Sequence, residues 1–487
     1  MTYMSINTSN PENKSANPVF VLGISGATWT VIEPLLMQGK LPNFQRLIDE
    51  GCSGIIKSIR VAGDKHFRPQ TAWPTLATGV IPEKHGITRY WHTASDLHVE
   101  TIWDIFQRNG FRVGLYGWPV TWPPSETNGF VVPSHLARDS QTWPPELAPI
   151  KELDQRQKRL EREKGVFTRI NEGCQSIAIL TKYGLSASTF PSLFRLFVKY
   201  IKAASAEERA LLLRYAKLEL SIDFFLNLYK RYTPTFVSFN SFLVDLVSHR
   251  YWRYYEPEKF GEVDQTAINR YRAALETAYE KLDCALGRCL AVMPGNTIVT
   301  VVSEHGMSAE IPSAEVGLYR YVIQGTQLLK LININDDVIP CSVARWIAFR
   351  PRDGVEFAPD FAERIQRIVV VETGLPLFSV HKHRENEVIV KFNIPHTVPR
   401  YQEGNLEDLT ISYEGKEVSF LSIARRLGRQ RSAMHDGDAV FIVAGPGIRK
   451  GYQIKDSNLL DFAPTLLHAA GLEIPVTFEG RKLDIFD

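Results

Sequence analysis

"VFVLGISGATW", residues 19–29, decides the fold class of this chain. Apolar residues run into the small residues Gly-Ile-Ser-Gly, a pattern typical of a buried strand that ends abruptly at a turn. A strand of this kind places its last side chain in a crevice. That side chain is Ser25, whose hydroxyl is a weak metal ligand and is not activated on its own. Its role therefore depends on which other residues reach the same edge of the sheet.

Similar apolar runs recur along the chain and predict further strands of one sheet. They read "FRVGLYGW", "TPTFVSFN", "NTIVTVVS" and "AVFIVAGPG", and each is rich in β-branched or aromatic residues. Each also adjoins a helical pattern, which is typical of parallel strands in a sheet covered on both faces. Because such sheets bind ligands at the carboxyl ends of their strands, the residues just after these runs are the first candidates for a site.

The composition is that of a soluble globular protein, with 44% apolar and 23% charged residues in 487. A formal net charge of +2 gives no strong field, so we expect no nucleic-acid partner. Five scattered cysteines without zinc-type pairs are typical of a reducing compartment. No run reaches the ~20 apolar residues that span a bilayer, and no secretory signal is recognisable. We therefore predict a cytoplasmic protein without a membrane partner.

The order of patterns along the chain predicts one core with two insertions. Residues 1–17 predict a disordered tail, and the core is assigned to 18–140, 235–310 and 431–487. Residues 141–234 are helical and charge-rich, whereas 311–430 mix short strands with a helix. We expect both insertions to cap the crevice at the strand ends.

The strand "TPTFVSFN" is followed by "SFLVDLVSHRYWRYYEP", in which Asp245 and His249 are four residues apart. On a helix this spacing puts both side chains on one face, where they can bind one metal ion. The alternative is a helix-capping aspartate and a surface histidine. His435, in "SAMHDGDAVFIVAGPG", would be a third ligand, although a lone histidine there can also be an ordinary loop residue.

The strand "NTIVTVVS" runs into "EHGMS", which places Glu304 and His305 at the expected mouth of the sheet. A carboxylate and an imidazole at a strand end suit a metal site or acid/base chemistry. Thr71 lies near the start of the helical segment "TAWPTLATG", where backbone N–H groups favour anions such as phosphate. The plainer alternatives are an ordinary loop for the first pair and a helix cap for Thr71.

Together these segments resemble the type I phosphodiesterase / nucleotide pyrophosphatase branch of the alkaline phosphatase superfamily. The resemblance rests on "VLGISGATW", "AWPTLATGVIPEKHGI", "YGWPVTWPP", "VDLVSHRYWRYYEP", "VVSEHG", "FIVAGPGIRKG" and "LLDFAPTLLHAAGLEIPVTFEGRKL", in that order. It implies a three-layer α/β/α sandwich with two adjacent divalent metals, commonly zinc, at the carboxyl edge of the sheet. It also implies hydrolysis of a phosphoester or phosphodiester in a small-molecule substrate, through a threonine or serine nucleophile.

The resemblance assigns one metal to an aspartate and a histidine four apart plus a histidine near the C-terminus. These positions are Asp245, His249 and His435, and all three ligands are present. One strong site for a divalent cation, with zinc as the first choice, is therefore expected.

The second metal site departs from the family pattern. Ser25 stands where the first strand normally supplies an aspartate, and Glu304 with His305 replaces an Asp-His pair. The nucleophile position falls on Pro69, which has no hydroxyl. The extra methylene of Glu304 shifts its carboxylate by roughly 1.5 Å, which is large against metal–ligand tolerances. We therefore expect the second metal to be weak, displaced or absent.

Three functions follow from these residues. The first is an enzyme with a mononuclear site, in which Glu304 or His305 acts as acid or base, on a phosphorus ester or in another metal-assisted reaction. His66 and Lys65, just upstream of Pro69, either contribute in the vacated space or lie in a solvated loop. The second is an ordinary phosphodiesterase or pyrophosphatase with Thr71 as a shifted nucleophile. The third is a non-catalytic binding protein on the same fold.

Overall fold

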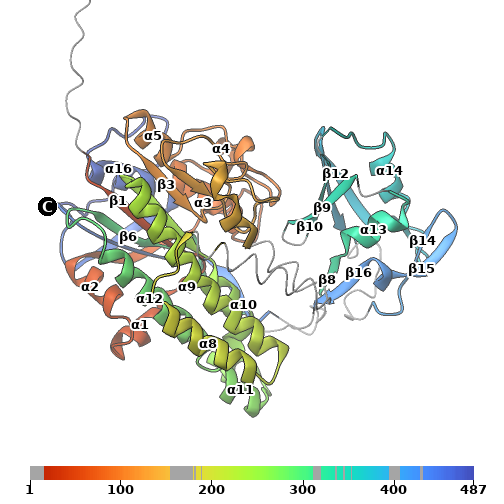
Figure 1. The fold of residues 1–487 in the computed structure, drawn as a ribbon, viewed down its shortest axis with the longest axis horizontal. Coiled ribbons are helices and arrows are strands. Elements are labelled where there is room, and N and C mark those ends of the chain that lie inside the picture. The colour runs from red at the N-terminus through yellow and green to blue at the C-terminus, as the bar shows by residue number, and fades with distance from the viewer. Residues whose placement is uncertain are drawn as a thin grey trace, which may run out of the picture.

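The computed structural model describes residues 16–153, 179, 183–187, 189–310, 320–334, 337–343, 346–352, 354–393, 406–427 and 431–487. Most of the predicted disordered tail and parts of both predicted insertions lie outside these residues. Figure 1 shows a large body of helices around a central sheet, with a second group of strands and short helices beside it.

The central sheet has eight strands, and all but one run in the same direction. Their order is β19 (Tyr452–Asn458), β2 (Gly51–Lys57), β18 (Asp438–Ala444), β6 (Ile298–Val302), β1 (Val19–Ile24), β5 (Phe236–Ser241), β3 (Val113–Tyr116) and β4 (Phe130–Val132). The opening stretch forms β1, which lies inside the sheet between β6 and β5. The strand predicted from that stretch is therefore confirmed.

Helices cover both faces of this sheet. One layer contains α1 (Trp29–Met37), α2 (Pro42–Glu50), α9 (Ala206–Tyr232), α10 (Leu243–Tyr255) and α12 (Ala274–Leu290), and the other α3 (Pro69–Thr78), α5 (Ile102–Arg108) and α16 (Phe462–Ala470). Within β1, Phe20, Leu22 and Ile24 face the first layer, while Val19 and Val21 face the second. This alternation is the period of two that a strand imposes, and it confirms the three-layer α/β/α sandwich.

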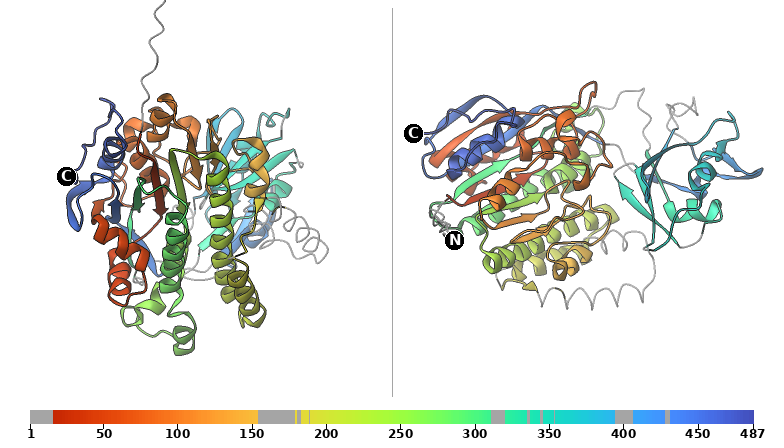
Figure 2. Two further views of the ribbon diagram at one scale, coloured as in Figure 1. Left: turned by 60° about the vertical axis from the view of Figure 1, so that its left-hand side comes forward. Right: turned by 90° about the horizontal axis from the view of Figure 1, so that it is seen from above.

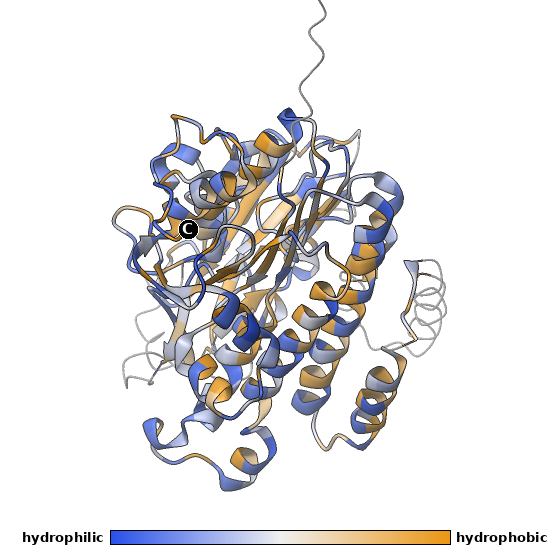
Figure 3. Ribbon diagram, turned by 90° about the vertical axis from the view of Figure 1, so that its left-hand side faces the viewer, coloured by the Kyte–Doolittle hydropathy of each residue, from blue (hydrophilic) through white to orange (hydrophobic). Residues whose placement is uncertain are grey.

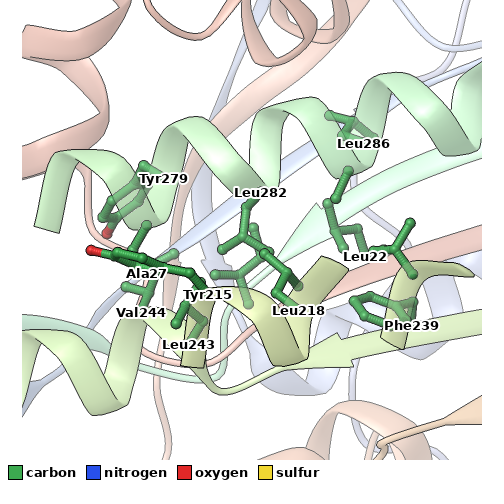
Figure 4. Close-up of a cluster of buried hydrophobic side chains, with 14 of the residues drawn as sticks. Leu22, Ala27, Tyr215, Leu218, Phe239, Leu243, Val244, Tyr279, Leu282 and Leu286 are labelled. Atoms are coloured by element: carbon green, nitrogen blue, oxygen red, sulfur yellow. The ribbon is translucent and has the colours of Figure 1, made fainter. Parts of the chain in front are cut away.

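The apolar interior lies between the sheet and each helical layer. Figure 3 shows hydrophobic strands enclosed by helices, and Figure 2 gives two further views of the layers. In Figure 4, Leu22 and Phe239 of the sheet pack between Leu282 of α12 and Leu218 of α9. Helix α9 belongs to the predicted helical insertion, yet its side chains contribute to the same apolar cluster as the sheet. The predicted boundaries of the insertions stay a prediction.

The prediction that "AVFIVAGPG" forms a parallel strand is wrong. It forms β18, which pairs antiparallel with both β6 and β2. A fully buried strand is apolar on both faces whichever way it runs, so its composition does not reveal its direction. The reversal has a consequence for the site: the residues before β18, rather than those after it, lie at the edge where β1, β5 and β6 end.

Residues 320–427 form smaller sheets around an apolar cluster of their own. The strands are β8 (Arg320–Ile323) with β16 (Ala424–Leu427), β9 (Val338–Val343), β10 (Trp346–Pro351), β12 (Phe378–Arg384) and β13 (Glu387–Phe392), and β11 (Val369–Val370), β14 (Thr410–Tyr413) and β15 (Lys416–Ser419). The helices are α13 (Gly325–Leu331) and α14 (Phe361–Gln366). We call this part the α+β insertion. Two further helices of the main body are α8 (Phe190–Lys202) and α11 (Gln265–Tyr271).

A buried ion pair joins the α+β insertion to the main body. Arg138 pairs with Glu387 of β13, and both side chains are nearly inaccessible to water. Arg138 also donates to the carbonyl of Trp91 at 2.6 Å. Nearby, Arg384 and Asp96 form a second pair at 2.9 Å. Because a buried charge left without its partner is costly, these contacts fix how the insertion sits on the body.

No helix in the described ranges is long and apolar enough to cross a membrane.

A buried histidine holds the turn after α3. His85 ends the short helix α4 (Pro82–His85) and has no exposed surface. The N–H of Ile87 donates to its Nδ1 at 3.1 Å. Thr75 gives its own proton to the carbonyl of Thr71, so its hydroxyl accepts from Nε2–H of His85 at 3.1 Å. Both ring nitrogens are therefore matched to the neutral imidazole, and burial lowers the pKa of His85 to about 4.

We predict that His85 makes the protein sensitive to acid. Its pKa of about 4 in the folded protein is below the ordinary histidine pKa of 6.5, so the unfolded chain binds the proton more readily. Neutral His85 contributes about 3 kcal/mol to the free energy of unfolding above pH ~6.5, and this contribution is lost as the pH falls toward 4. Urea unfolding between pH 4 and 7 measures this slope, which should become shallower in His85→Gln and stay unchanged in His98→Gln, at an exposed position. An equal slope in His85→Gln would contradict the assignment.

Candidate metal centre

Helix α10 carries Asp245 and His249 to the end of β1. The helix begins almost directly after β5, so its first turn lies at the carboxyl edge of the sheet. The N–H of Asp245 donates to the carbonyl of Ser25 at 3.1 Å. Gly26 has a φ of +74°, and a Cβ there would meet the Cα of Asp245 at 3.2 Å. The small residues after β1 therefore let α10 approach the strand end closely.

A short antiparallel ribbon brings His435 to the same place. β17 (Ala433–Asp436) pairs with β7 (Gly306–Ala309), with His435 opposite Met307. A Cβ on Gly306 would lie 2.2 Å from a carboxylate oxygen of Asp436, so only glycine allows this approach. The ribbon stacks the ring of His435 on that of His305, with their centroids 3.8 Å apart.

Backbone carbonyls orient the three imidazole rings. In each ring Nδ1 lies within hydrogen-bond distance of a carbonyl oxygen, which can only accept. The pairs are His249 with Ala433 at 2.8 Å, His435 with Phe67 at 2.8 Å and His305 with Gly306 at 3.0 Å. Nδ1 therefore carries the proton in His435 and His305, whereas Nδ1 of His249 also accepts from Nε of Arg431 at 3.1 Å. For a neutral histidine this leaves the Nε2 lone pair available, which is how proteins prepare a metal ligand.

The ligand atoms predicted from the sequence converge. Nε2 of His249 and Nε2 of His435 are 3.0 Å apart, and Oδ1 of Asp245 is 3.3 Å and 3.1 Å from them. Ligands at about 2.0–2.1 Å from a tetrahedral ion are separated by roughly 3.3 Å. The three residues therefore fit one tetrahedrally coordinated divalent cation.

His305 lies beside this group but makes a different contact. Its side chain and those of Asp245 and His435 offer atoms within 4.8 Å of one another. Its Nε2, however, is 3.1 Å from Oε1 of Glu304, and both side chains are fully buried. Burial lowers the pKa of His305, but the Glu304 carboxylate outweighs burial and raises it. The Glu304 carboxylate therefore favours the protonated form of His305.

Ser25 and His305 both contact Glu304 at the position expected for a second metal. The hydroxyl of Ser25 donates to Oε1 of Glu304 at 2.5 Å, and both residues have no exposed surface. That distance is shorter than the roughly 3.3 Å between two ligands of one tetrahedral ion, so a cation does not fit between these oxygens. Nε2 of His305 lies 3.1 Å from the same Oε1 atom of Glu304.

The charges in the centre favour a neutral His435 and an ionised Asp245. Burial lowers the pKa of His435 to about 4, and the charge of His305 lowers it further against the pull of Asp245. Burial raises the pKa of Asp245, but His249 and His435 outweigh it and hold that pKa well below its usual range. Asp245 is thus an anion and His435 is neutral near pH 7, as a cation site requires.

The remaining predicted residues lie around α3. Pro69 opens the helix, and Thr71 is buried in its first turn with its hydroxyl donating to the carbonyl of Arg68 at 3.1 Å. His66 and Lys65 are exposed in the preceding loop, where the N–H of His66 donates to Asp64. The loop does reach the centre, but through the carbonyl of Phe67, which accepts from His435.

Sequence reasoning missed Arg431. Its Nη2 lies 2.8 Å from Nε2 and 2.9 Å from Nδ1 of His249, and its Nε donates to the same Nδ1 at 3.1 Å, so the guanidinium contacts both ring nitrogens. Glu310 is 3.7 Å from the same guanidinium. The position of Arg431 four residues before His435 was the available signal. The backbone carbonyls that orient the rings could not be predicted from the sequence, because every residue has a backbone carbonyl.

The fold is an α/β/α sandwich, and Asp245, His305 and His435 at the carboxyl edge of its sheet form a group that could hold a metal ion. The sequence model of type I phosphodiesterase / nucleotide pyrophosphatase matches residues 19–363, and the chain belongs to that family. It is a family of hydrolases, consistent with the predicted enzymatic activity.

A solved structure of human ectonucleotide pyrophosphatase / phosphodiesterase 5 is similar to this chain at 13% identity and a TM-score of 0.40. That match covers 94% of this chain and 96% of the human one. No curated protein matches this sequence.

We predict that His435→Ala loses the bound cation while keeping the fold. The substitution removes one of the three converging ligand atoms. Zinc affinity, measured by competition with a chromophoric chelator, should fall by roughly 100-fold or more. His66→Ala is the matched control, because its side chain is exposed in the adjoining loop. Equal zinc affinity in the two variants would rule out His435 as a ligand.

Proposed function

We propose that this protein is a phosphodiesterase or pyrophosphatase that works with one divalent cation, zinc by the nitrogen-rich character of its ligands. Asp245, His249 and His435 would hold the cation, and the observation that carries the proposal is the 3.0–3.3 Å spacing of their ligand atoms. The 2.5 Å contact between Ser25 and Glu304 supports a single site. When bound there, the cation would supply Lewis acidity toward a phosphoryl oxygen.

The surrounding side chains are suited to the rest of the reaction. The guanidinium of Arg431, at the open side of His249, can bind a second phosphoryl oxygen as the transition state gains charge. The buried pair of His305 and Glu304 holds a proton at Nε2 of His305, 3.1 Å from the carboxylate. That proton is available to a leaving-group oxygen, so His305 acts as the general acid and Glu304 keeps it charged.

The absence of a hydroxyl at Pro69 makes direct attack by water the simplest route. Thr71 is the alternative nucleophile, but its hydroxyl is engaged with the carbonyl of Arg68 in the buried first turn of α3. Phosphoryl transfer to Thr71 would first require that hydrogen bond to break.

We predict that hydrolysis of bis(4-nitrophenyl) phosphate by the metal-free protein is restored by zinc and saturates at about one equivalent per chain. Asp245→Asn should lose this activity, because it removes the negative charge of a ligand carboxylate while keeping the side chain nearly the same size. Saturation at about two equivalents would contradict a mononuclear site.

The double variant Ser25→Asp with Glu304→Asp tests the reason for the single site. It restores two short carboxylates where Ser25 and Glu304 now touch, so zinc binding should rise toward about two equivalents per chain. Ser25→Ala is the matched control and should stay near one, because it opens the contact without adding a ligand. If Ser25→Ala bound a second zinc ion, the loss of a ligand at position 25 would not be the reason for the single site.

We further predict that Thr71→Val keeps activity within about threefold of the wild type, since a direct water attack does not use this hydroxyl. Thr78→Val is the matched control, because Thr78 makes the same kind of contact, to the carbonyl of Pro74 at 2.7 Å, in the same helix. A loss of about 100-fold or more in Thr71→Val alone would establish Thr71 as the nucleophile.

A further inference from the structure

Helix α8 carries a line of exposed apolar side chains. Phe190, Phe194, Phe197 and Ile201 each keep 57–64% of their surface exposed. Their spacing of four, three and four residues puts them on one side of the helix over three turns. Burial of large apolar side chains is the main favourable term in folding, so an exposed line of this kind indicates a binding surface.

The opposite side of α8 already packs against the protein. Leu196 is buried in the apolar cluster of the main body. Ser192 donates to a carboxylate oxygen of Glu219 on α9 at 3.0 Å. Figure 1 shows α8 alongside α9, away from the central sheet. The exposed line is therefore a second face of an anchored helix.

Positive charge borders this apolar line. At about 100° per residue, Arg195 and Lys202 lie on one flank of the apolar line, whereas Lys199 lies close to the opposite side of the helix. Helix α8 contains no acidic residue. A helix that combines an aromatic apolar side with basic residues is typical of segments that lie in the plane of a membrane surface. The basic side chains would meet the headgroups of anionic lipids while the phenylalanines enter the acyl boundary.

A second copy of the chain fits this face less well. The four side chains expose on the order of 500 Å², whereas a stable interface buries about 800 Å² on each partner. Pairing α8 with itself would also bring six basic residues together without an acidic partner on either helix. Shallow insertion into a bilayer needs no partner side chain and gains from the same charges.

We propose that α8 binds the surface of an anionic lipid bilayer, with Phe190, Phe194, Phe197 and Ile201 inserted. This goes beyond the proposed function, because no residue of the metal centre takes part. It also revises the expectation of no membrane partner, which rested on the length needed to span a bilayer. At 13 residues α8 is far too short to span, but length does not limit a helix that lies in the surface.

Co-sedimentation of the full chain with phosphatidylcholine vesicles, with and without roughly 30% phosphatidylserine, tests the proposal. We expect binding to the phosphatidylserine vesicles, a decrease of about tenfold or more in Phe194→Gln with Phe197→Gln, and a similar decrease in Arg195→Glu with Lys202→Glu. Met37→Gln is the matched control, because Met37 is 82% exposed on another helix and should leave binding unchanged.

Three results would overturn the proposal. The first is a wild type that does not bind phosphatidylserine vesicles. The second is a phenylalanine variant that binds these vesicles as well as Met37→Gln does. The third is a wild-type dimer in sedimentation velocity that the phenylalanine substitutions dissociate, in which case the face binds a second copy. Activity on bis(4-nitrophenyl) phosphate in solution should be the same in all these variants, so a failure here is distinct from a failure of the proposed function.

Discussion

The carbonyl–imidazole hydrogen bonds are the constraint on which the centre depends. They place the proton of His435 on Nδ1, so its Nε2 faces Asp245 without a proton of its own. The carbonyls come from three separate segments, which are the loop before α3, the start of β7 and the start of β17. The chemistry of the site is thus a product of backbone positions that only the whole fold can supply.

The same edge of the sheet holds two centres of opposite character. On one side the anionic Asp245 lies beside the neutral ring of His435, and on the other His305 lies beside the carboxylate of Glu304. Ser25 carries no charge, and its hydroxyl donates to Oε1 of Glu304. The Glu304 carboxylate raises the pKa of His305 and so favours a positive ring beside it.

Much of this arrangement could be predicted from the sequence, because local patterns carry it. The strand "VFVLGI" and the spacing of Asp245 and His249 are readable without knowledge of distant residues. The direction of β18 was not readable, since a strand buried on both faces has the same composition either way. The Ser25–Glu304 contact and the position of Arg431 depend on side chains from distant segments, so they emerge only from tertiary structure.

The ribbon of β7 and β17 also determines how this protein can change over evolutionary time. The α+β insertion leaves the sandwich after Ala309 and returns before Ala433, and these two residues pair with each other. The chain therefore enters and leaves the insertion at one pair of neighbouring residues. An insertion joined in this way can be lengthened, shortened or exchanged while His435 on the ribbon keeps its place.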